Sequence, residues 1–348
     1  MSPATPLNRR IVLAKRPQAT ATLDCFRLEE SPLPAPRDGE VLLRTLWLSL
    51  DPYMRGRMSD APSYAAPVAL GDVMTGGNVS RVETSLNPKF KPGDLVVAYR
   101  GWQEYAISGG NDLVKLPPGV PHPSYALGIL GMPGYTAYCG LLQIGKPQTG
   151  ETVVVAAATG AVGSVVGQIA RLKGCRVVGI AGGAEKCSWA VKELGFDQCI
   201  DHRSKNFEAN LKVACANGID VYFENVGGKV FRAVLPLLNT LARVPLCGVI
   251  SHYNETPIED TPNWQAALLR TLLVKRITLR GFIVDQDFGD PGKEFFDTMQ
   301  EWMRTGQLKY REDIVRGIEN APEAFLGLLA GRNFGKLLVQ VSSPETMA

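Results

Sequence analysis

The fold is decided by the stretch AAATGAVGSVVGQIARLKG, residues 156–174 of the chain. No charged side chain lies between Glu151 and Arg171, and a window of this length could cross a bilayer. The hydrophobic period, however, changes at the glycines, and no second apolar span follows. We therefore expect a core segment that changes from strand to helix, and no membrane span.

The segment before the glycines, TVVVAA at 152–157, is a β-branched run typical of a strand buried on both faces. After the glycines, apolar residues recur at helical spacing up to Gly174: they are Val162, Val165, Val166, Ile169 and Leu172. CRVVGIA, at 175–181, is typical of a second buried strand. Strand, turn, helix and strand within about 30 residues indicate a βαβ unit.

The turn of this unit, 158–163, reads ATGAVG, a variant of G-x-G-x-x-G with alanine in the first place. A small Ala158 permits the tight turn, Gly160 lets a pyrophosphate approach the backbone, and Gly163 lets the helix pack on the strand. The helix N-terminus attracts the anion. A packed corner without a ligand is the alternative, but the flanking strands favour a dinucleotide site that also includes Ala161 and Val162.

The residues at the end of the second strand indicate which of the two nicotinamide dinucleotides, NAD or NADP, the site prefers. NAD sites usually carry Asp or Glu there for the ribose hydroxyls, but this chain has GIAGGAEKC at 179–187. Lys186, with His202 and Arg203 after the next short strand, suits a 2′-phosphate. Lys186 alone is equally compatible with a solvated helix start. Together the three basic residues favour NADPH.

The rest of the chain divides into regions of different pattern. Strands and helices alternate through 129–305, which predicts a doubly wound parallel α/β sheet of the Rossmann type. Residues 1–128 read as short strands between Pro/Gly turns, typical of an all-β domain. The tail, 306–348, reads as strand, helix, turn and strand, and we expect it to return to the β domain.

Composition excludes several classes of function. The 348 residues include 37 Lys+Arg and 34 Asp+Glu, a net charge of +3 that is too even for a nucleic-acid or membrane-surface partner. The seven cysteines are scattered without a CxxC motif, which indicates free thiols. No basic, apolar leader opens the chain, so we expect a cytoplasmic protein.

Several motifs, in order, resemble one known family: LSLDPYMRGRM (48–58), GMPGYTAYCGLL (131–142), the fingerprint, FENVGG (223–228), CGVISHYN (247–254), GFIV (281–284) and RNFGK (332–336). They resemble the zinc-independent medium-chain dehydrogenases/reductases, and within them the NADPH-dependent 2-alkenal, leukotriene–prostaglandin and curcumin reductases. The resemblance runs from about residue 8 to 341.

This resemblance implies a GroES-like β domain built from both chain ends, an inserted Rossmann domain and a cleft joining them. It implies hydride transfer from NADPH to the β-carbon of an α,β-unsaturated ketone or aldehyde, followed by protonation of the α-carbon. It also implies a homodimer. Two alternatives stay open: an NADPH quinone reductase of the same superfamily and a non-enzymatic NADPH-binding protein.

No metal site is expected. Zinc-dependent relatives need Cys and His ligands and a four-cysteine loop. Here the ligand-bearing segment is replaced by GDVMTGG (71–77), and the three histidines, His122, His202 and His252, lack ligand-type neighbours. Hydrogen-bond donors must then stabilise the developing enolate.

The resemblance suggests roles for individual residues. Tyr253, in SHYN, is the candidate catalytic donor, although a structural role or protonation by water is the alternative. Tyr53, Tyr64 and Arg55 are candidate substrate contacts, with packing or surface charge as the alternative. The further cofactor contacts implied are Met132, Thr136, Asn225, Phe282, Ile283, Val284, Asn333 and Gly335. The loops at 59–69 and 252–264 are expected to shape the substrate pocket.

Overall fold

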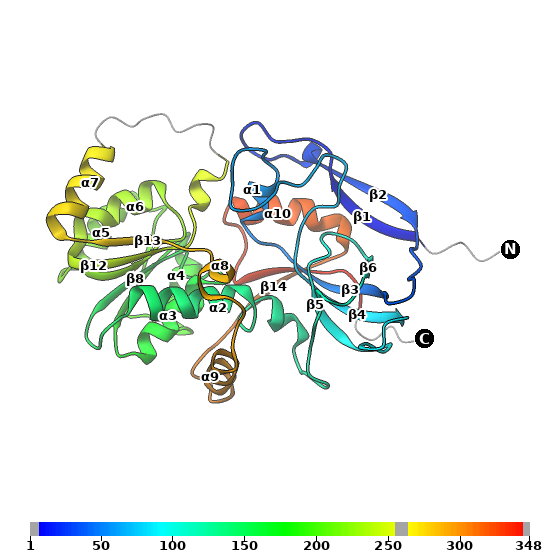
Figure 1. Ribbon diagram of the computed structural model, residues 1–348. Helices are drawn as coiled ribbons and strands as arrows, with labels where there is room; N and C mark the ends of the chain where they lie inside the picture. The colour runs from blue at the N-terminus through cyan, green and yellow to red at the C-terminus, as the bar shows by residue number, and fades with distance from the viewer. Residues whose placement is uncertain (1–6, 255–263, 344–348) are drawn as a thin grey trace. The chain divides into compact units, whose positions relative to one another are not determined.

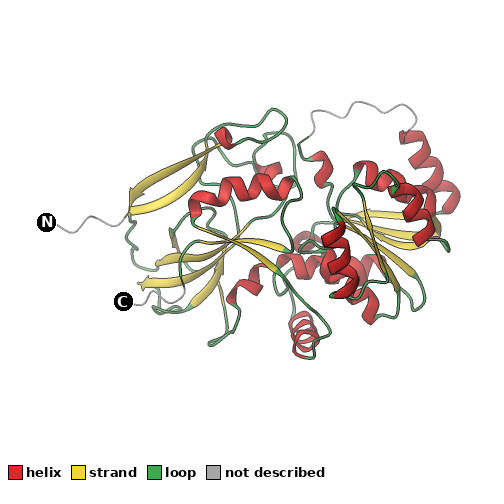
Figure 2. Cartoon of the chain, turned by 180° about the vertical axis from the view of Figure 1, so that it is seen from behind, coloured by secondary structure: helices red, strands yellow, loops and turns green. Residues whose placement is uncertain are grey.

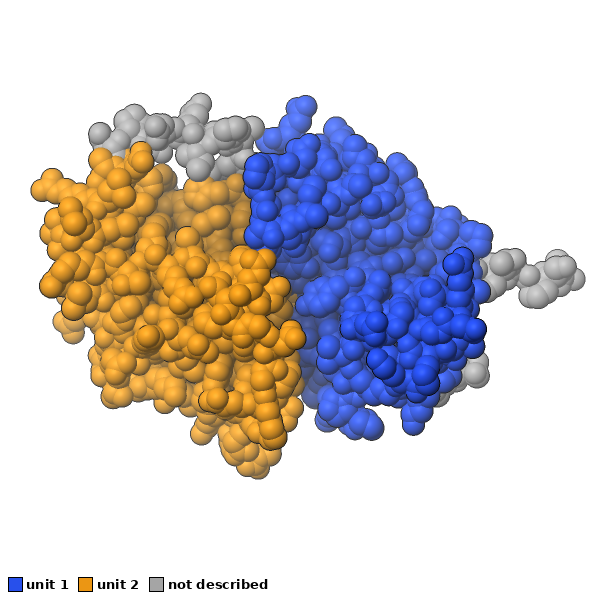
Figure 3. All heavy atoms as spheres, viewed as in Figure 1, with its two compact units in different colours: residues 1–127, 312–333, 337–348 blue, residues 128–311, 334–336 orange. Residues whose placement is uncertain are grey.

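The computed structural model describes residues 7–254 and 264–343, so residues 255–263 of the expected pocket loop lie outside the described residues. The chain forms two compact units, which Figure 3 colours separately. Unit 1 comprises Met1–Leu127, Glu312–Asn333 and Leu337–Ala348, and unit 2 comprises Gly128–Arg311 and Phe334–Lys336.

These limits differ from the predicted domains in the tail, because residues 306–311 and 334–336 belong to unit 2. Lys309 is held there by Gln168, whose side chain accepts from the Lys309 N–H at 2.7 Å and donates to its carbonyl at 2.9 Å. The Gly335 N–H donates to the carbonyl of Thr159 at 3.1 Å. Such long-range backbone contacts leave no periodic signal in the sequence.

Unit 2 is built on a parallel sheet of six strands within the described residues. The strands are β8 (Thr152–Ala156), β9 (Arg176–Ala181), β10 (Gln198–Asp201), β11 (Ile219–Phe223), β12 (Leu238–Leu246) and β13 (Thr278–Gly281). Their order, β10-β9-β8-β11-β12-β13, is that of a dinucleotide-binding doubly wound sheet and confirms the predicted Rossmann fold. The direction of winding reverses between β8 and β11, and ligands of such sheets bind at this point.

Helices cover both faces of this sheet (Figure 1). The helices of unit 2 are α2 (Met132–Cys139), α3 (Gly163–Leu172), α4 (Ala184–Lys192), α5 (Phe207–Ala214), α6 (Gly228–Val234), α7 (Trp264–Lys275), α8 (Val284–Phe288) and α9 (Lys293–Arg304). α5, α6 and α7 lie on one face, where Leu211 and Val234 pack with Val154 and Val178 of the sheet. α3 lies on the other face, against β8 and β9.

The uncharged window of the sequence is therefore strand, turn and buried helix, as predicted. Every residue of β8 and eight successive residues of α3 are buried. Among the described residues, no helix combines the length and the apolar character needed to cross a bilayer.

Among the regular elements of unit 1, strands predominate over helices, as Figure 2 shows. Its strands are β1 (Leu7–Leu13), β2 (Phe26–Pro32), β3 (Val41–Ser49), β4 (Asn78–Ser85), β5 (Leu95–Ala98), β6 (Tyr105–Ser108), β7 (Val114–Lys115), β14 (Glu312–Arg316) and β15, whose span Lys336–Gln340 begins in unit 2. Two short helices, α1 (Met54–Arg57) and α10 (Ala321–Leu329), accompany them. β15 pairs antiparallel with β3, so both ends of the chain build one sheet.

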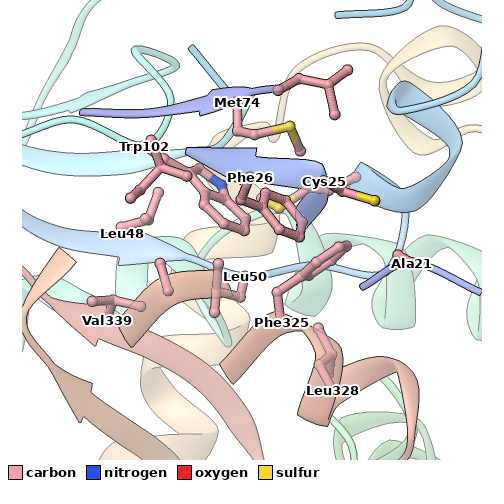
Figure 4. Packing of buried hydrophobic residues seen from close by; sticks show 14 of the residues in the cluster. Ala21, Cys25, Phe26, Leu48, Leu50, Met74, Trp102, Phe325, Leu328 and Val339 are labelled. Atoms are coloured by element: carbon pink, nitrogen blue, oxygen red, sulfur yellow. The ribbon is translucent and has the colours of Figure 1, made fainter. Parts of the chain in front are cut away.

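The core of unit 1 also joins both chain ends (Figure 4). The Trp102 ring stacks on Phe26 with centroids 5.5 Å apart, and Phe325 of α10 meets both rings edge-on. Leu48 of β3 and Val339 of β15 complete the same cluster. The C-terminal segment is thus part of the core of unit 1. Without Phe325, the two aromatic rings of Phe26 and Trp102 would lose a packing partner.

Candidate cofactor site

The fingerprint turn connects β8 to α3 at the point where the sheet reverses its winding. The Gly160 N–H donates to the carbonyl of Ala157 at 2.9 Å and closes the turn. The left-handed residue is Ala157, with φ of 52°, whereas Ala158 is fully buried. The small side chain of Ala158, which we expected to permit the tight turn, packs closely against β9, since a Cβ on Gly179 would lie 2.8 Å from it.

The two glycines of the turn have different surroundings. A Cβ on Gly163 would lie 2.3 Å from the Ala157 carbonyl oxygen, so α3 can pack on the turn only with glycine there. A Cβ on Gly160 would meet only that oxygen, at 3.3 Å, among the described atoms within 4 Å. Gly160 thus has open space on one side, beside the half-buried Ala161 and Val162. A phosphate group can approach the backbone in that space.

The segment 334–336 lies beside this turn. Gly335 forms a parallel bridge with Gly160, and its φ of 90° together with the close Arg311 carbonyl requires glycine. The Arg311 guanidinium stacks 4.0 Å from the centroid of the Phe334 ring. The predicted Gly335 therefore lies at the fingerprint, whereas the predicted Asn333 belongs to unit 1. Arg311 was not predicted, because no local motif marks it.

Basic side chains gather where β9 and β10 end. A Cβ on Gly182 would lie 3.0 Å from His202 Nε2 and 3.1 Å from Arg203 Nε. Asp201 Oδ1 accepts the N–H groups of Gly183 and Arg203, each at 2.9 Å. Burial raises the pKa of the Asp201 carboxyl, but these hydrogen bonds and the nearby basic groups outweigh it, so the pKa is lowered. The Asp201 carboxylate thus accepts hydrogen bonds from the backbone of this turn. The neighbouring basic side chains are candidates to bind an anionic ligand.

The surroundings of His202 disfavour its protonated, positively charged form, so its pKa is lowered. Burial is the main cause of the lowered pKa, and the positive charges of Lys229 and Arg203 lower the pKa further. Lys229 stands in the first turn of α6, directly after Gly227-Gly228, and was missed by the sequence reasoning. The available signal was a lysine shortly after the end of a strand and a glycine turn, as for Lys186 in the first turn of α4. We call Lys186, His202, Arg203 and Lys229 the basic cluster.

The ends of β8 and β11 are joined by a side chain across the switch point. Asn225 Nδ2 donates to the carbonyl of Ala156 at 2.8 Å. The preceding Glu224 is fully buried, and its carboxylate accepts from Tyr222 Oη at 2.9 Å and from the N–H groups of Val226 at 2.5 Å and Gly227 at 2.9 Å. Burial raises the pKa of Glu224. Sequence reasoning did not single out this carboxylate, which fixes the turn that carries Asn225.

The SHYN segment after β12 is bonded to the same turn. The Ser251 N–H donates to the Val226 carbonyl at 3.0 Å, and the Gly228 N–H donates to His252 Nε2 at 2.9 Å. Gly227 has a φ of 76°, and a Cβ there would lie 2.8 Å from His252 Nε2. The glycine pair therefore permits the close approach of the histidine.

These contacts fix Tyr253 beside the switch point. A Cβ on Gly248 would lie 3.4 Å from the Tyr253 hydroxyl oxygen and 3.7 Å from the carbonyl oxygen of Asn225. The phenol is half-buried and lies at the carboxyl ends of β11 and β12. Unit 2 thus brings together the predicted Tyr253, Asn225 and fingerprint region at one edge of the sheet.

Other residues of unit 2 that were predicted to contact the cofactor already bond or pack with neighbouring protein groups. The Thr136 hydroxyl donates to the carbonyl of Met132 at 2.7 Å, within α2. Phe282 and Val284 are buried, and the Ile283 N–H donates to Asp287 Oδ2 at 2.9 Å. The strand β13 ends at Gly281, and the chain enters α8 at Val284.

In unit 1, the candidate substrate residues separate into two groups. The Arg57 guanidinium lies over the rings of Tyr53, at 5.8 Å, and Tyr64, at 5.2 Å from the centroids. Arg55 is instead buried, and its guanidinium donates to the carbonyl of Ala19 at 2.6 Å. This contact gives Arg55 a structural role within unit 1, whereas Arg57 is half-buried between the two rings and donates to the Ala66 carbonyl at 3.0 Å.

The histidines do not provide a metal-ligand set. The His122 ring stacks on Tyr125, His202 belongs to the basic cluster, and His252 accepts from Gly228. Nowhere in residues 7–254 and 264–343 do three His, Cys, Asp or Glu side chains group as metal ligands would. These donors do not fit a catalytic zinc.

Comparison with known proteins gives the family. A profile described as the N-terminal domain of oxidoreductase matches residues 9–116, and one described as zinc-binding dehydrogenase matches residues 161–303. NADPH-dependent curcumin reductase of Escherichia coli (strain K12) is 57% identical over 97% of this chain and 98% of its own. Prostaglandin reductase 1 of Rattus norvegicus is 43% identical over 90% and 93%.

A solved structure, CurA in complex with NADPH from Vibrio vulnificus, matches 97% of this chain and 100% of its own, with a TM-score of 0.94 and 57% identity. The chain therefore belongs to the zinc-independent medium-chain dehydrogenases/reductases, in the branch of the curcumin, prostaglandin and 2-alkenal reductases.

Proposed function

We propose that this protein reduces the carbon–carbon double bond of α,β-unsaturated ketones and aldehydes, and that Tyr253 donates a hydrogen bond to the substrate carbonyl. NADPH is the cofactor, and its nicotinamide supplies the hydride when it is bound. The observation that carries the assignment of Tyr253 is that its hydroxyl packs close to Gly248, at the carboxyl ends of β11 and β12, with the Asn225 carbonyl oxygen near the same glycine. Ligands of doubly wound sheets bind at this edge.

The chemistry requires a donor at the substrate oxygen. Addition of a hydride to the β-carbon places negative charge on the carbonyl oxygen, as an enolate. A phenol hydroxyl is a hydrogen-bond donor at neutral pH, and a fixed donor aimed at a developing charge lowers the barrier. Tyr253 can act in this way whether it or water then delivers the proton to the α-carbon, so the double bond is reduced and the carbonyl survives.

Neighbouring groups hold this donor in place. The bonds from Ser251 to Val226 and from Gly228 to His252 tie the SHYN segment to the β11 turn, which Glu224 and Asn225 anchor in turn. A donor that is positioned before substrate arrives needs no reorganisation during the reaction. These contacts support Tyr253 as a preorganised donor.

We assign the parts of NADPH to the predicted residues as follows. The pyrophosphate lies on Gly160, Ala161, Val162 and Gly163 with Gly335, and the 2′-phosphate lies on the basic cluster. The nicotinamide and its ribose contact Met132, Thr136, Asn225, Asn333 and the backbone of Phe282, Ile283 and Val284. Tyr53 and Tyr64 contact the substrate, with the Arg57 guanidinium beside them.

We also propose that the protein is a cytoplasmic homodimer that pairs through unit 2. β13 is the last strand of its sheet in the described part of the chain, and its backbone is available for pairing. On the neighbouring α7, Leu269, Leu273 and Val274 are 58%, 78% and 68% exposed. All seven cysteines are free thiols, as is usual in a reducing compartment.

The function is tested by mixing the protein with NADPH and a short-chain enone and following the loss of NADPH absorbance. We expect turnover with enones and none with the matching allyl alcohols. Tyr253→Phe should lower kcat about 100-fold, as expected for loss of one oxyanion donor, and leave the NADPH Kd unchanged. Tyr105→Phe, in a strand of unit 1, is the matched control.

An unchanged kcat in Tyr253→Phe would remove this residue as the donor. A preference for quinones over enones would favour the quinone reductase, and NADPH binding without turnover on any enone would favour a non-enzymatic protein.

The two fingerprint glycines should respond differently to a methyl group. Gly160→Ala places its Cβ in open space, so the fold should be kept while NADPH affinity falls about tenfold or more, roughly 1.4 kcal/mol. Gly163→Ala forces a backbone shift and should lower the free energy of unfolding by about 1–3 kcal/mol. Urea unfolding and NADPH fluorescence titration measure the two effects. Equal NADPH affinity in Gly160→Ala and the wild type would contradict the pyrophosphate assignment.

The basic cluster predicts a pH dependence of NADPH affinity. The pKa of His202 is lowered in the free protein, so the imidazole is neutral at pH 7. A bound 2′-phosphate dianion favours the protonated form and raises this pKa. Binding therefore takes up a proton, and affinity weakens as pH rises through the pKa of the complex, about tenfold per unit by which the pKa is raised.

Titrations of the protein with NADPH and with NADH, over a range of about pH 5 to pH 9, test this coupling between proton uptake and cofactor binding. NADH lacks the phosphate and His202→Gln lacks the titrating group, so both should lose this part of the dependence. Identical NADPH profiles for wild type and His202→Gln would show that His202 does not contact the phosphate.

The dimer is tested by sedimentation, which should give twice the chain mass of 37.7 kDa. Leu273→Glu places a charge on the exposed face of α7 and should shift the protein to the monomer. Leu70→Glu, at a 57% exposed position of unit 1, should leave the dimer intact. A wild-type monomer at micromolar concentration would be inconsistent with this proposal.

A further inference from the structure

Two thiols meet where α4 packs against β10. Cys187 lies in α4 and Cys199 in β10, and their side chains are hydrogen-bonded to each other. Both residues are half-buried, so a small reagent can reach them. The Cys199 sulfur also lies against β9, since a Cβ on Gly179 would be 3.0 Å from it. The reaction proposed above uses neither thiol.

The same two segments of chain carry the basic cluster. Lys186 directly precedes Cys187, and the Cys187 N–H donates to the carbonyl of Gly183 at 3.2 Å. Asp201 follows Cys199 by two residues and bonds to the backbone of Gly183 and Arg203. The thiol pair and the carboxylate therefore connect the β9–α4 turn with the end of β10 at neighbouring points.

We propose that Cys187 and Cys199 form a reversible disulfide, and that its formation by hydrogen peroxide or an organic hydroperoxide weakens the binding of NADPH through its 2′-phosphate. The disulfide itself is independent of the proposed function. Its effect on the cofactor rests on the assignment of the basic cluster.

The oxidation balances in two steps. The Cys187 thiolate attacks the peroxide oxygen, which gives a sulfenic acid and, after protonation, one water or alcohol. The Cys199 thiol then attacks the sulfenic sulfur, so an S–S bond forms and a water leaves. Two thiols lose two electrons and two protons, and the peroxide is reduced. A dithiol reductant reverses the reaction by thiol–disulfide exchange.

The surroundings favour Cys187 over the other thiols of the chain as the point of attack. The hydrogen bond from Cys199 lowers the pKa of Cys187, which raises its thiolate fraction. Burial instead raises the pKa of Cys175 and of Cys215 to about 11, so these thiols remain protonated.

Closing the bond is expected to shift the proposed phosphate site. Two sulfurs in hydrogen-bond contact must approach to about 2.05 Å to form a disulfide, which draws the start of α4 and β10 together. Such a shift reaches the basic side chains, because His202 and Arg203 pack over Gly182 of the β9–α4 turn: a Cβ on Gly182 would lie 3.0 Å from His202 Nε2 and 3.1 Å from Arg203 Nε. A shift of this kind changes the spacing of the charges that meet the phosphate, and NADH has no group there.

The test compares reduced and peroxide-treated protein by peptide mapping and by titration with NADPH and NADH. We expect a linked Cys187–Cys199 peptide and a rise in the NADPH Kd of about fivefold or more, the low end of typical coupling between sites. The NADH Kd should stay constant, and dithiothreitol should restore the NADPH Kd. Cys187→Ser and Cys199→Ser should each abolish the effect.

Cys175→Ser is the matched control and should respond like the wild type, because a serine keeps the donor that bonds to the Gln148 carbonyl. No linked peptide at a peroxide dose that oxidises free glutathione would overturn the proposal. So would a linked peptide with unchanged NADPH affinity, or a peroxide effect that persists in Cys187→Ser. Reduced protein that binds NADPH and NADH equally would instead contradict the proposed phosphate assignment, and the peptide map would still decide the disulfide.

Discussion

The structure of unit 2 depends on how closely α3 approaches the end of β8. The chain leaves the strand at Ala157 in a left-handed conformation, and the Gly160 N–H bonds back to its carbonyl. Only a glycine at 163 lets the helix start so near that carbonyl oxygen. The left-handed alanine costs about 1–2 kcal/mol, a strain that the packed sheet around it must offset. What the strain achieves is a helix N-terminus with open backbone at Gly160.

The candidate catalytic edge is connected to this turn by a chain of hydrogen bonds. Asn225 connects the end of β8 to the β11 turn, the buried Glu224 fixes that turn, and Gly228 bonds to His252 in the next loop. The position of Tyr253 is thus set by groups in three strand-end loops. Glycine at 227 matters as much as the tyrosine itself, since any side chain there would displace the histidine.

The sequence predicted what depends on local pattern and missed what depends on long-range contact. The change of period at the glycines identified the βαβ unit and its fingerprint, because strand and helix periods are local properties. The left-handed residue of the turn is Ala157, which no motif marks, since the position of the turn depends on how β8 pairs with β9. Arg55 was expected at the substrate and bonds to Ala19 instead, a contact between segments 36 residues apart.

Residues of the candidate site that lie outside any sequence motif also could not be predicted from the sequence. Glu224 resembles any acidic residue after a strand until its three donors are seen, and Lys229 is identified only by the pKa of a histidine on another element. The family resemblance supplied Tyr253 and Asn225, because SHYN and FENVGG stand as motifs in the sequence. Neither motif reveals that the two segments bond to each other.

The positive charges around His202 connect its protonation to the binding of an anion. Lys229 and Arg203 lie near His202, at the ends of β11 and β10, where their charges repel a protonated imidazole and, together with burial, lower the pKa of His202. In the free protein His202 relieves part of this repulsion by remaining neutral. Under the proposed assignment of the 2′-phosphate, a bound dianion supplies the missing counter-charge, and a ligand that binds only the folded state stabilises it. The charges that keep His202 neutral in the free protein are then the same charges that discriminate NADPH from NADH.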